Sequence, residues 1–138
     1  MREAIRILMA EDDPDDRMLA RDALEEARLV NHIDFVEDGE ELMAYLREEP
    51  PPGLILLDLN MPKKDGREAL AEIKADPNLR HIPVVVLTTS KEEEDVARTY
   101  DLGVNSFIVK PVTFESLVDI MKAIAKYWFE IVRLPSEK

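Results

Sequence analysis

Side chains suited to phosphoryl chemistry follow short apolar segments at four places in this 138-residue sequence. An acidic run occupies residues 11–13, Asp58 ends a second apolar segment, Thr88 ends a third, and Lys110 follows a fourth. Crowded carboxylates repel one another, by about 4 kcal/mol for two charges about 4 Å apart at an effective dielectric constant of about 20. A hard divalent cation relieves that repulsion, and Mg²⁺ favours carboxylates, water and phosphate oxygens as ligands. The residue types therefore indicate phosphoryl transfer at a magnesium site.

The reacting group in such a site can be an aspartate, which forms an aspartyl phosphate. Asp58 is the candidate nucleophile. Mg²⁺ and Lys110 would offset the charge of the transferring group, and the hydroxyl of Thr88 would donate to a phosphoryl oxygen. This hypothesis requires the side chains to converge, which depends on the elements that carry them.

The apolar segments before these residues have the length of buried strands, and three are rich in β-branched residues. Strands are predicted at residues 5–10, 33–37, 54–58, 82–88 and 106–109. Helices are predicted from Pro14 after an Asp13 cap, over 40–49, over 67–75, from a Ser90–Glu93 capping box to Gly103, and from Phe114 onwards. The alternation predicts an α/β fold, a doubly wound (βα)5 sandwich with a five-stranded parallel sheet. Ligand sites in such sheets lie beyond the carboxyl ends of the strands, where the candidate residues fall.

Composition narrows the possible partners. The chain has 18 basic and 30 acidic residues and a net charge of −12, which argues against nucleic acid and anionic membrane surfaces as partners. It has no cysteine, so a disulfide, a thiolate metal site and a cysteine nucleophile are excluded. No apolar run approaches the roughly 20 residues of a membrane-spanning helix, and the N-terminal segment is too charged for a signal peptide. A cytoplasmic location is therefore expected.

The segment at residues 57–66, Leu-Asp-Leu-Asn-Met-Pro-Lys-Lys-Asp-Gly, resembles the phosphoacceptor loop of response-regulator receiver domains. The acidic pair at 11–12, Thr88 and the Lys110-Pro111 dipeptide stand at matching positions and spacings. The resemblance covers about residues 4–126 and implies a flavodoxin-like receiver fold. It also implies that Asp58 is the phosphoacceptor.

The resemblance assigns the metal site to four residues. Asp12 would bind Mg²⁺ directly and Glu11 would act through water. Asp58 and the main-chain carbonyl of Asn60 would complete the protein ligands. Glu11 stands where aspartate is commoner in the family, which matters little to a role through water.

The resemblance also assigns a switch. Thr88 and Phe107 would be the switch pair. Lys110 would contact the phosphoryl group, and the peptide bond between Lys110 and Pro111 is expected to be cis. Phe107 stands where tyrosine is common, so it keeps the ring without the hydroxyl. Thr89 is bulkier than the small residue often found at its position, and it would narrow access to the phosphoryl group.

Residues 127–135, Tyr-Trp-Phe-Glu-Ile-Val-Arg-Leu-Pro, resemble the extension of stand-alone regulators that partner phytochrome-type histidine kinases. The expected organisation is a receiver domain at 1–126 and, at 127–138, an extension of the last helix with a tail. Apolar residues beyond the stripe that covers the sheet predict a homodimer interface, formed by Tyr127, Phe129, Ile131, Val132 and Leu134. A tail folded back on its own domain, or a kinase-docking surface, is the alternative.

The function implied by the resemblance is that of a single-domain response regulator in a two-component phosphorelay. It would accept a phosphoryl group from a histidine kinase and change the surface formed by the fourth helix, fifth strand and fifth helix. Self-phosphorylation from small phosphodonors and self-dephosphorylation are expected, rather than activity as an enzyme.

Three alternatives use other features of the same sequence. A Mg²⁺-dependent phosphatase-like enzyme with an aspartate nucleophile usually carries a second acid two residues later, where this chain has Asn60. A flavin or nucleotide carrier of similar fold would have a glycine-rich loop after the first strand, where acids stand instead. A scaffold that has lost phosphorylation would have no use for the intact set of acids, threonine and lysine.

Overall fold

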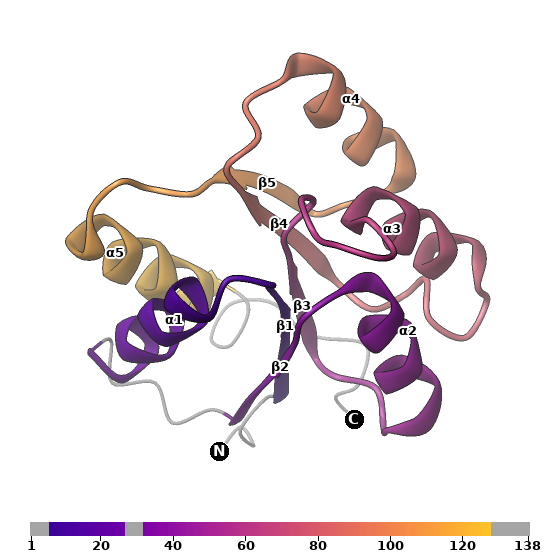
Figure 1. The fold of residues 1–138 in the computed structure, drawn as a ribbon, viewed down its shortest axis with the longest axis horizontal. Coiled ribbons are helices and arrows are strands. Elements are labelled where there is room, and N and C mark those ends of the chain that lie inside the picture. Colours follow the sequence, from indigo (N-terminus) through magenta and orange to yellow (C-terminus); the bar gives the residue numbers. More distant parts are fainter. Residues whose placement is uncertain (1–5, 27–31, 128–138) are drawn as a thin grey trace.

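Five short strands pair in parallel in the computed structural model, which describes residues 6–26 and 32–127 (Figure 1). The strands are β1 (Arg6–Ala10), β2 (His32–Val36), β3 (Leu54–Leu57), β4 (Val84–Thr88) and β5 (Ser106–Val109). Their order in the sheet is β2-β1-β3-β4-β5, so the winding reverses between β1 and β3. The predicted doubly wound parallel sheet is confirmed, and each predicted strand lies within two residues of its observed bounds.

Helices cover both faces of the sheet. The helices are α1 (Pro14–Glu26), α2 (Gly39–Glu48), α3 (Gly66–Ala75), α4 (Glu93–Leu102) and α5 (Phe114–Ala125). Figure 1 shows α1 beside α5 on one face and α2, α3 and α4 on the other. Because side chains alternate along a strand, Ile7 and Met9 of β1 join the core under α1 and α5, whereas Leu8 and Ala10 join the core under α2 and α3. Burial on both faces explains the continuous apolar runs.

The start of α4 differs from the predicted capping box. The helix begins at Glu93, and Glu92 at the N-cap position makes no side-chain capping hydrogen bond. The hydroxyl of Ser90 donates instead to the carboxylate of Asp95, at 2.6 Å. The capping-box prediction is therefore wrong, because Ser90 lies outside the N-cap position and its hydroxyl donates to the buried, charged carboxylate of Asp95 in the first turn of α4.

Two glycines let the loop after β3 pack closely against its surroundings. The amide of Gly66 donates to the carbonyl of Leu59 at 3.0 Å, and a Cβ atom at Gly66 would lie 2.3 Å from the carbonyl oxygen of Asp58. The amide of Gly39 donates to the carbonyl of Lys64 at 2.9 Å, and a Cβ atom there would lie 2.1 Å from that oxygen. The loop at 58–66 is thus fixed against the starts of α2 and α3.

The C-terminal tail is only partly covered by the structure. Phe129, Ile131, Val132 and Leu134, predicted to form a dimer interface, lie outside the described residues. Tyr127 is described and has 52% of its surface exposed. Within residues 6–26 and 32–127, no helix has the length and apolar character needed to cross a bilayer.

Candidate functional site

The candidate residues meet at one edge of the sheet. Glu11 and Asp12 directly follow β1, Asp58 directly follows β3, Thr88 ends β4, and Lys110 directly follows β5. Parallel strands place all of these carboxyl ends on the same side, and β1 and β3, which carry the acids, are hydrogen-bonded neighbours. The structure thus brings together the side chains that the sequence suggested for phosphoryl chemistry.

Three carboxylates form a compact cluster at this edge. One oxygen each from Glu11, Asp12 and Asp58 lies within 4.8 Å of the others. Glu11 and Asp58 are 1% and 5% exposed, whereas Asp12 is exposed. Hard oxygen donors with one side open to water suit an ion that retains part of its hydration shell. The donor set therefore fits a divalent cation such as Mg²⁺.

Lys110 balances the charge of the cluster. Its Nζ contacts the carboxylate of Glu11, lies 2.9 Å from Asp16 Oδ2 and lies 3.2 Å from Asp58 Oδ2. Burial disfavours the charged amine, but the hydrogen bonds to Glu11 and Asp16 outweigh burial and raise the pKa of Lys110 above its ordinary value. The lysine therefore stays protonated as the cationic partner of three acids.

The carboxylate of Asp58 is held in one orientation. Its Oδ1 accepts a hydrogen bond from the Thr88 hydroxyl at 2.7 Å and another from the Asn60 amide at 3.1 Å. Thr88 is fully buried, so its hydroxyl has few other partners. The side chain of Asn60 reaches across the site and donates to the Thr89 hydroxyl at 3.4 Å. These contacts tie the end of β3 to the end of β4 around Asp58.

Burial changes the acidity of Glu11. Desolvation raises the pKa of this carboxyl to about 7 from an ordinary 4.5; the hydrogen bond from Lys110 opposes that rise, and the nearby charge of Asp58 adds to it. The amide of Asp13 donates to Glu11 Oε2 at 3.2 Å. The site thus contains a carboxyl group that takes up a proton near neutral pH unless further positive charge is present.

The second residue of the predicted switch pair, Phe107, lies between the core and α4. Phe107 is partly buried against the core under α2, α3 and α4. Its amide donates to the hydroxyl of Tyr100 at 3.1 Å, which joins β5 to α4.

The peptide bond between Lys110 and Pro111 is trans in this structure, so the prediction of a cis bond is wrong.

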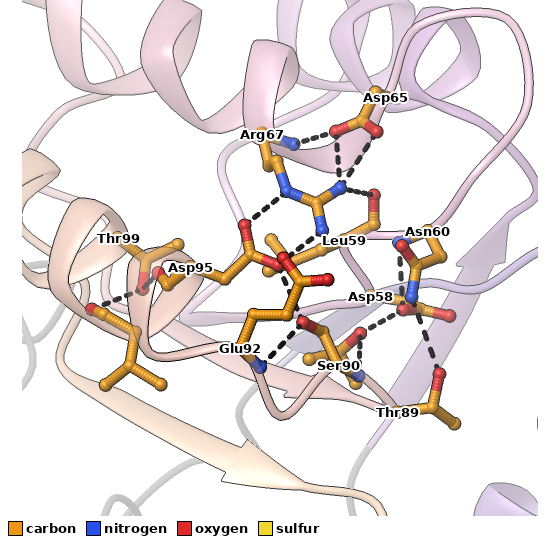
Figure 2. A network of polar contacts seen from close by, with 12 residues as sticks. Asp58, Leu59, Asn60, Asp65, Arg67, Thr89, Ser90, Glu92, Asp95 and Thr99 are labelled. Carbon is orange, nitrogen blue, oxygen red and sulfur yellow. Dashed lines mark hydrogen bonds and ion pairs between the residues drawn. The ribbon is translucent and has the colours of Figure 1, made fainter.

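Two features of the site were missed by sequence reasoning. Asp16 reaches Lys110 from the first turn of α1, and an ion pair joins Arg67 to Asp95 beside the loop after Asp58 (Figure 2). The acidic run at 11–16 contained the signal for Asp16, but only the packing of α1 against α5 and the adjoining loop selects it from its neighbours. No local pattern links Arg67 to Asp95.

The arrangement at this sheet edge is that of a receiver domain. Residues 7–122 match the response regulator receiver domain family, and the chain belongs to that family. It is therefore a response regulator of two-component signalling, a class that implies a histidine kinase partner and a divalent metal. The comparisons give no support to the phosphatase-like alternative.

Individual relatives indicate which kind of response regulator this chain is similar to. The response regulator Rcp1 of Synechocystis sp. is 43% identical over 136 residues, which cover 94% of this chain and 92% of the relative. The phosphorylated cyanobacterial phytochrome response regulator RcpA superposes with a TM-score of 0.90 at 46% identity, covering 97% of this chain and all of that one. A Mn²⁺-bound form of Rcp1 gives a TM-score of 0.88 at 43% identity, covering 96% and 99%. This chain is homologous to phytochrome response regulators.

The raised pKa of Glu11 predicts a specific pH dependence of stability. The folded protein binds this proton more tightly than the unfolded chain, whose carboxyl titrates near 4.5. The contribution of Glu11 to the free energy of unfolding is therefore largest below that value and falls as the pH rises toward 7. From about pH 5 to about pH 8, wild type should lose on the order of 2 kcal/mol relative to Glu11→Gln in urea unfolding.

The matched control for this measurement is Glu25→Gln, at an exposed position of α1. Its free energy of unfolding should follow that of wild type across the same pH range, because an exposed carboxylate has a similar pKa in the folded and unfolded chains. A constant difference between wild type and Glu11→Gln over the range would show that Glu11 titrates normally.

Proposed function

We propose that this receiver domain accepts a phosphoryl group on Asp58 from a histidine kinase, in a Mg²⁺-dependent reaction, and then changes its α4–β5–α5 surface. The observation that supports it most is the setting of Asp58. This carboxylate lies at the end of a central strand, fixed by Thr88 and Asn60 and close to the ammonium group of Lys110.

The transfer is an in-line displacement at phosphorus. A carboxylate oxygen of Asp58 forms the new P–O bond while the P–N bond to the kinase histidine breaks, and the electron pair of that bond returns to the imidazole. Lys110 already lies 3.2 Å from Asp58 Oδ2, where it offsets charge on the incoming phosphoryl oxygens. The Thr88 hydroxyl, which donates to Asp58 in the unmodified protein, would donate to a phosphoryl oxygen after transfer.

The metal ligands follow from the acidic cluster and the family pattern. Asp12, Asp58 and the main-chain carbonyl of Asn60 would hold Mg²⁺ directly, and Glu11 would act through water. When bound, the ion would supply positive charge to the phosphoryl oxygens. Lys110 is one cation among three carboxylates, so it neutralises them only in part. The metal would supply the remaining positive charge.

The change of surface would begin at Thr88 and Phe107. Phosphorylation adds about two negative charges, and it would draw the Thr88 hydroxyl to the phosphoryl group and turn the Phe107 ring inward. Phe107 is joined to Tyr100 of α4 through its main-chain amide, so a shift in β5 would reach α4. Phosphorylation would thus shift an existing equilibrium between two conformations of the domain.

A hollow beside Lys110 suits contact with a protein donor of the phosphoryl group. Leu19, Val112 and Phe114 are 41%, 102% and 40% exposed, and together with Lys110 they line one hollow between α1 and the loop after β5. Exposed apolar groups clustered next to reactive residues are typical of protein-binding surfaces. RcpA is a phytochrome response regulator, which supports a kinase of the phytochrome type acting in the cytoplasm. The net charge of −12 makes nucleic acid an unsuitable partner.

The first test concerns the acceptor. Asp58→Asn should abolish labelling by acetyl phosphate and by a cognate kinase, because the amide cannot form the acyl phosphate. Asp13→Asn, at an exposed position of the same acidic edge, is the matched control and should label normally. Undiminished, hydroxylamine-sensitive labelling of Asp58→Asn would place the acceptor elsewhere.

The second test concerns the metal. Asp12→Ala should retain the fold, since the side chain is exposed, but bind Mg²⁺ about tenfold or more weakly because a carboxylate ligand is lost. Calorimetric titration gives the affinity, and the rate of labelling by acetyl phosphate should fall with it. Asp15→Ala, in the first turn of α1, is the control. Equal Mg²⁺ affinity in Asp12→Ala and wild type would rule out this ligand set.

A homodimer is proposed through the segment at 127–138, which would extend the receiver domain at 1–126. Its apolar composition supports the proposal, with Tyr127, Phe129, Ile131, Val132 and Leu134 in eight residues. Two-fold dimers are the commonest way to bury such a surface. Phe129→Asp with Ile131→Asp should shift the protein toward monomer in sedimentation velocity at tens of micromolar. A wild-type chain that sediments as a monomer, phosphorylated or not, would contradict the dimer.

A further inference from the structure

An ion pair joins the beginning of α3 to the beginning of α4. Arg67 Nε donates to Asp95 Oδ1 and Arg67 Nη2 donates to Asp95 Oδ2, each at 2.6 Å. Asp95 is 6% exposed, and the hydrogen bonds from Arg67 lower the pKa of its carboxyl to about 2. The pair is therefore bidentate, largely buried and charged at any physiological pH.

The aspartate of this pair holds the loop that follows Thr88. Asp95 Oδ2 accepts a hydrogen bond from the Ser90 hydroxyl at 2.6 Å, and Ser90 lies two residues after Thr88, whose hydroxyl donates to Asp58. Figure 2 shows this chain of contacts running from Asp58 through the loop to Asp95. The conformation of the β4–α4 loop is thus anchored at both of its ends.

The arginine of the pair holds the loop that follows Asp58. Its Nη1 donates to the carbonyl of Leu59 at 3.4 Å and to Asp65 Oδ2 at 3.0 Å. One guanidinium group therefore contacts both the β3–α3 loop and the first turn of α4. A five-donor planar group can bridge two segments in this way, whereas a lysine offers a single point charge.

We propose that Arg67 and Asp95 are positioning residues that hold the β4–α4 loop beside phosphorylated Asp58 and so protect the phosphoryl group from water. The pair fixes Thr89 and Ser90 beside Asp58 and carries any displacement of that loop to α4. This inference rests on the function proposed above. Neither side chain hydrogen-bonds to Asp58 among the described contacts, so the pair acts through Ser90 and the Leu59 carbonyl.

The pair owes its role to its position and not to its charge. Buried ion pairs are weak evidence for stability, since apolar residues of similar size often replace them without loss. Arg67 and Asp95, however, meet at the junction of two loops that both reach Asp58. The other end of α4 is joined to the switch strand, because Tyr100 accepts a hydrogen bond from the Phe107 amide. Helix α4 is thus attached at both ends to segments that respond to the site.

A second ion pair in the same region provides a matched control. Lys64 Nζ lies 2.6 Å from both carboxylate oxygens of Glu72. This pair joins the β3–α3 loop to the body of α3 and has no hydrogen bond to the β4–α4 loop among the described residues. Its removal leaves the hydrogen bonds from the Gly39 and Gly66 amides that fix the β3–α3 loop, and it should not loosen Ser90.

The test compares variants of the full-length chain. The double variant Arg67→Met with Asp95→Leu removes the charges together, so that neither is left buried alone. Each protein is labelled with acetyl phosphate and Mg²⁺, the donor is removed, and the half-life of the aspartyl phosphate is measured. The half-life should fall about threefold or more in the double variant, because a loosened loop admits water to the phosphoryl group. The control double variant Lys64→Met with Glu72→Leu should retain the wild-type half-life.

A milder variant keeps the test decisive if the double variant does not fold. Ser90→Ala leaves the ion pair intact and removes only its hydrogen bond to the loop, so the half-life should again fall. Asp95→Asn preserves the shape and one acceptor oxygen, and it should restore much of the wild-type half-life relative to the double variant. If the pair only stabilised the fold, the half-life would not fall in Ser90→Ala and would not recover in Asp95→Asn.

A second measurement follows α4 itself. In wild type, amide resonances of Val96 and Tyr100 should shift when beryllium fluoride and Mg²⁺ are added as a phosphoryl mimic. In the double variant the shifts should remain near Asp58 and Thr88 but be lost along α4. Equal half-lives and equal α4 shifts in wild type, the double variant and Ser90→Ala would overturn the inference. A complete absence of Asp58-dependent labelling in wild type would instead overturn the proposed function, so the two failures are distinct.

Discussion

Mutual repulsion among buried carboxylates is the constraint on which the rest of this molecule depends. Glu11 and Asp58 are almost fully buried, Asp12 lies beside them, and Asp16 reaches toward the same lysine. Burying like charges is costly unless cations compensate them. Lys110 supplies one positive charge, and its hydrogen bond to Glu11 does not offset the burial that raises the pKa of this carboxyl. The site is therefore built to gain stability from a divalent cation, and a phosphoryl group brings further oxygen ligands for that cation.

The fold makes this crowding possible. Parallel strands deliver their carboxyl ends to one edge, and the winding reverses between β1 and β3, which is where ligand sites lie in such sheets. The loop after β3 is then locked by close glycine contacts at Gly39 and Gly66. Asp58 consequently sits on a rigid support, whereas the described hydrogen bonds of Thr89 and Ser90 in the β4–α4 loop involve side chains. That difference suits a switch, because side-chain hydrogen bonds can be exchanged while the sheet stays unchanged.

The sequence was sufficient to place Asp58, Thr88 and Lys110 at one edge, because each directly ends or follows a strand with a strong apolar pattern. Contacts between distant segments were beyond its reach. Arg67 and Asp95 are 28 residues apart, and only the packing of α3 against α4 brings them together. The hydrogen bond from the Ser90 hydroxyl to Asp95 was equally hidden, because it depends on where α4 begins, and Ser90 was therefore wrongly assigned to a helix cap. The expected cis bond before Pro111 came from family resemblance and not from any feature of the neighbouring residues.

The central claim is that Asp58 carries the phosphoryl group, and reductive trapping tests it most directly. An acyl phosphate is reduced by borohydride to an alcohol, so phosphorylated aspartate becomes homoserine, which peptide mass spectrometry locates. After treatment with acetyl phosphate and Mg²⁺, the account predicts homoserine at position 58 and nowhere else, with none formed when Mg²⁺ is chelated. Homoserine at Asp12 or Asp13 instead, or equal conversion of Asp58 without a divalent cation, would contradict it.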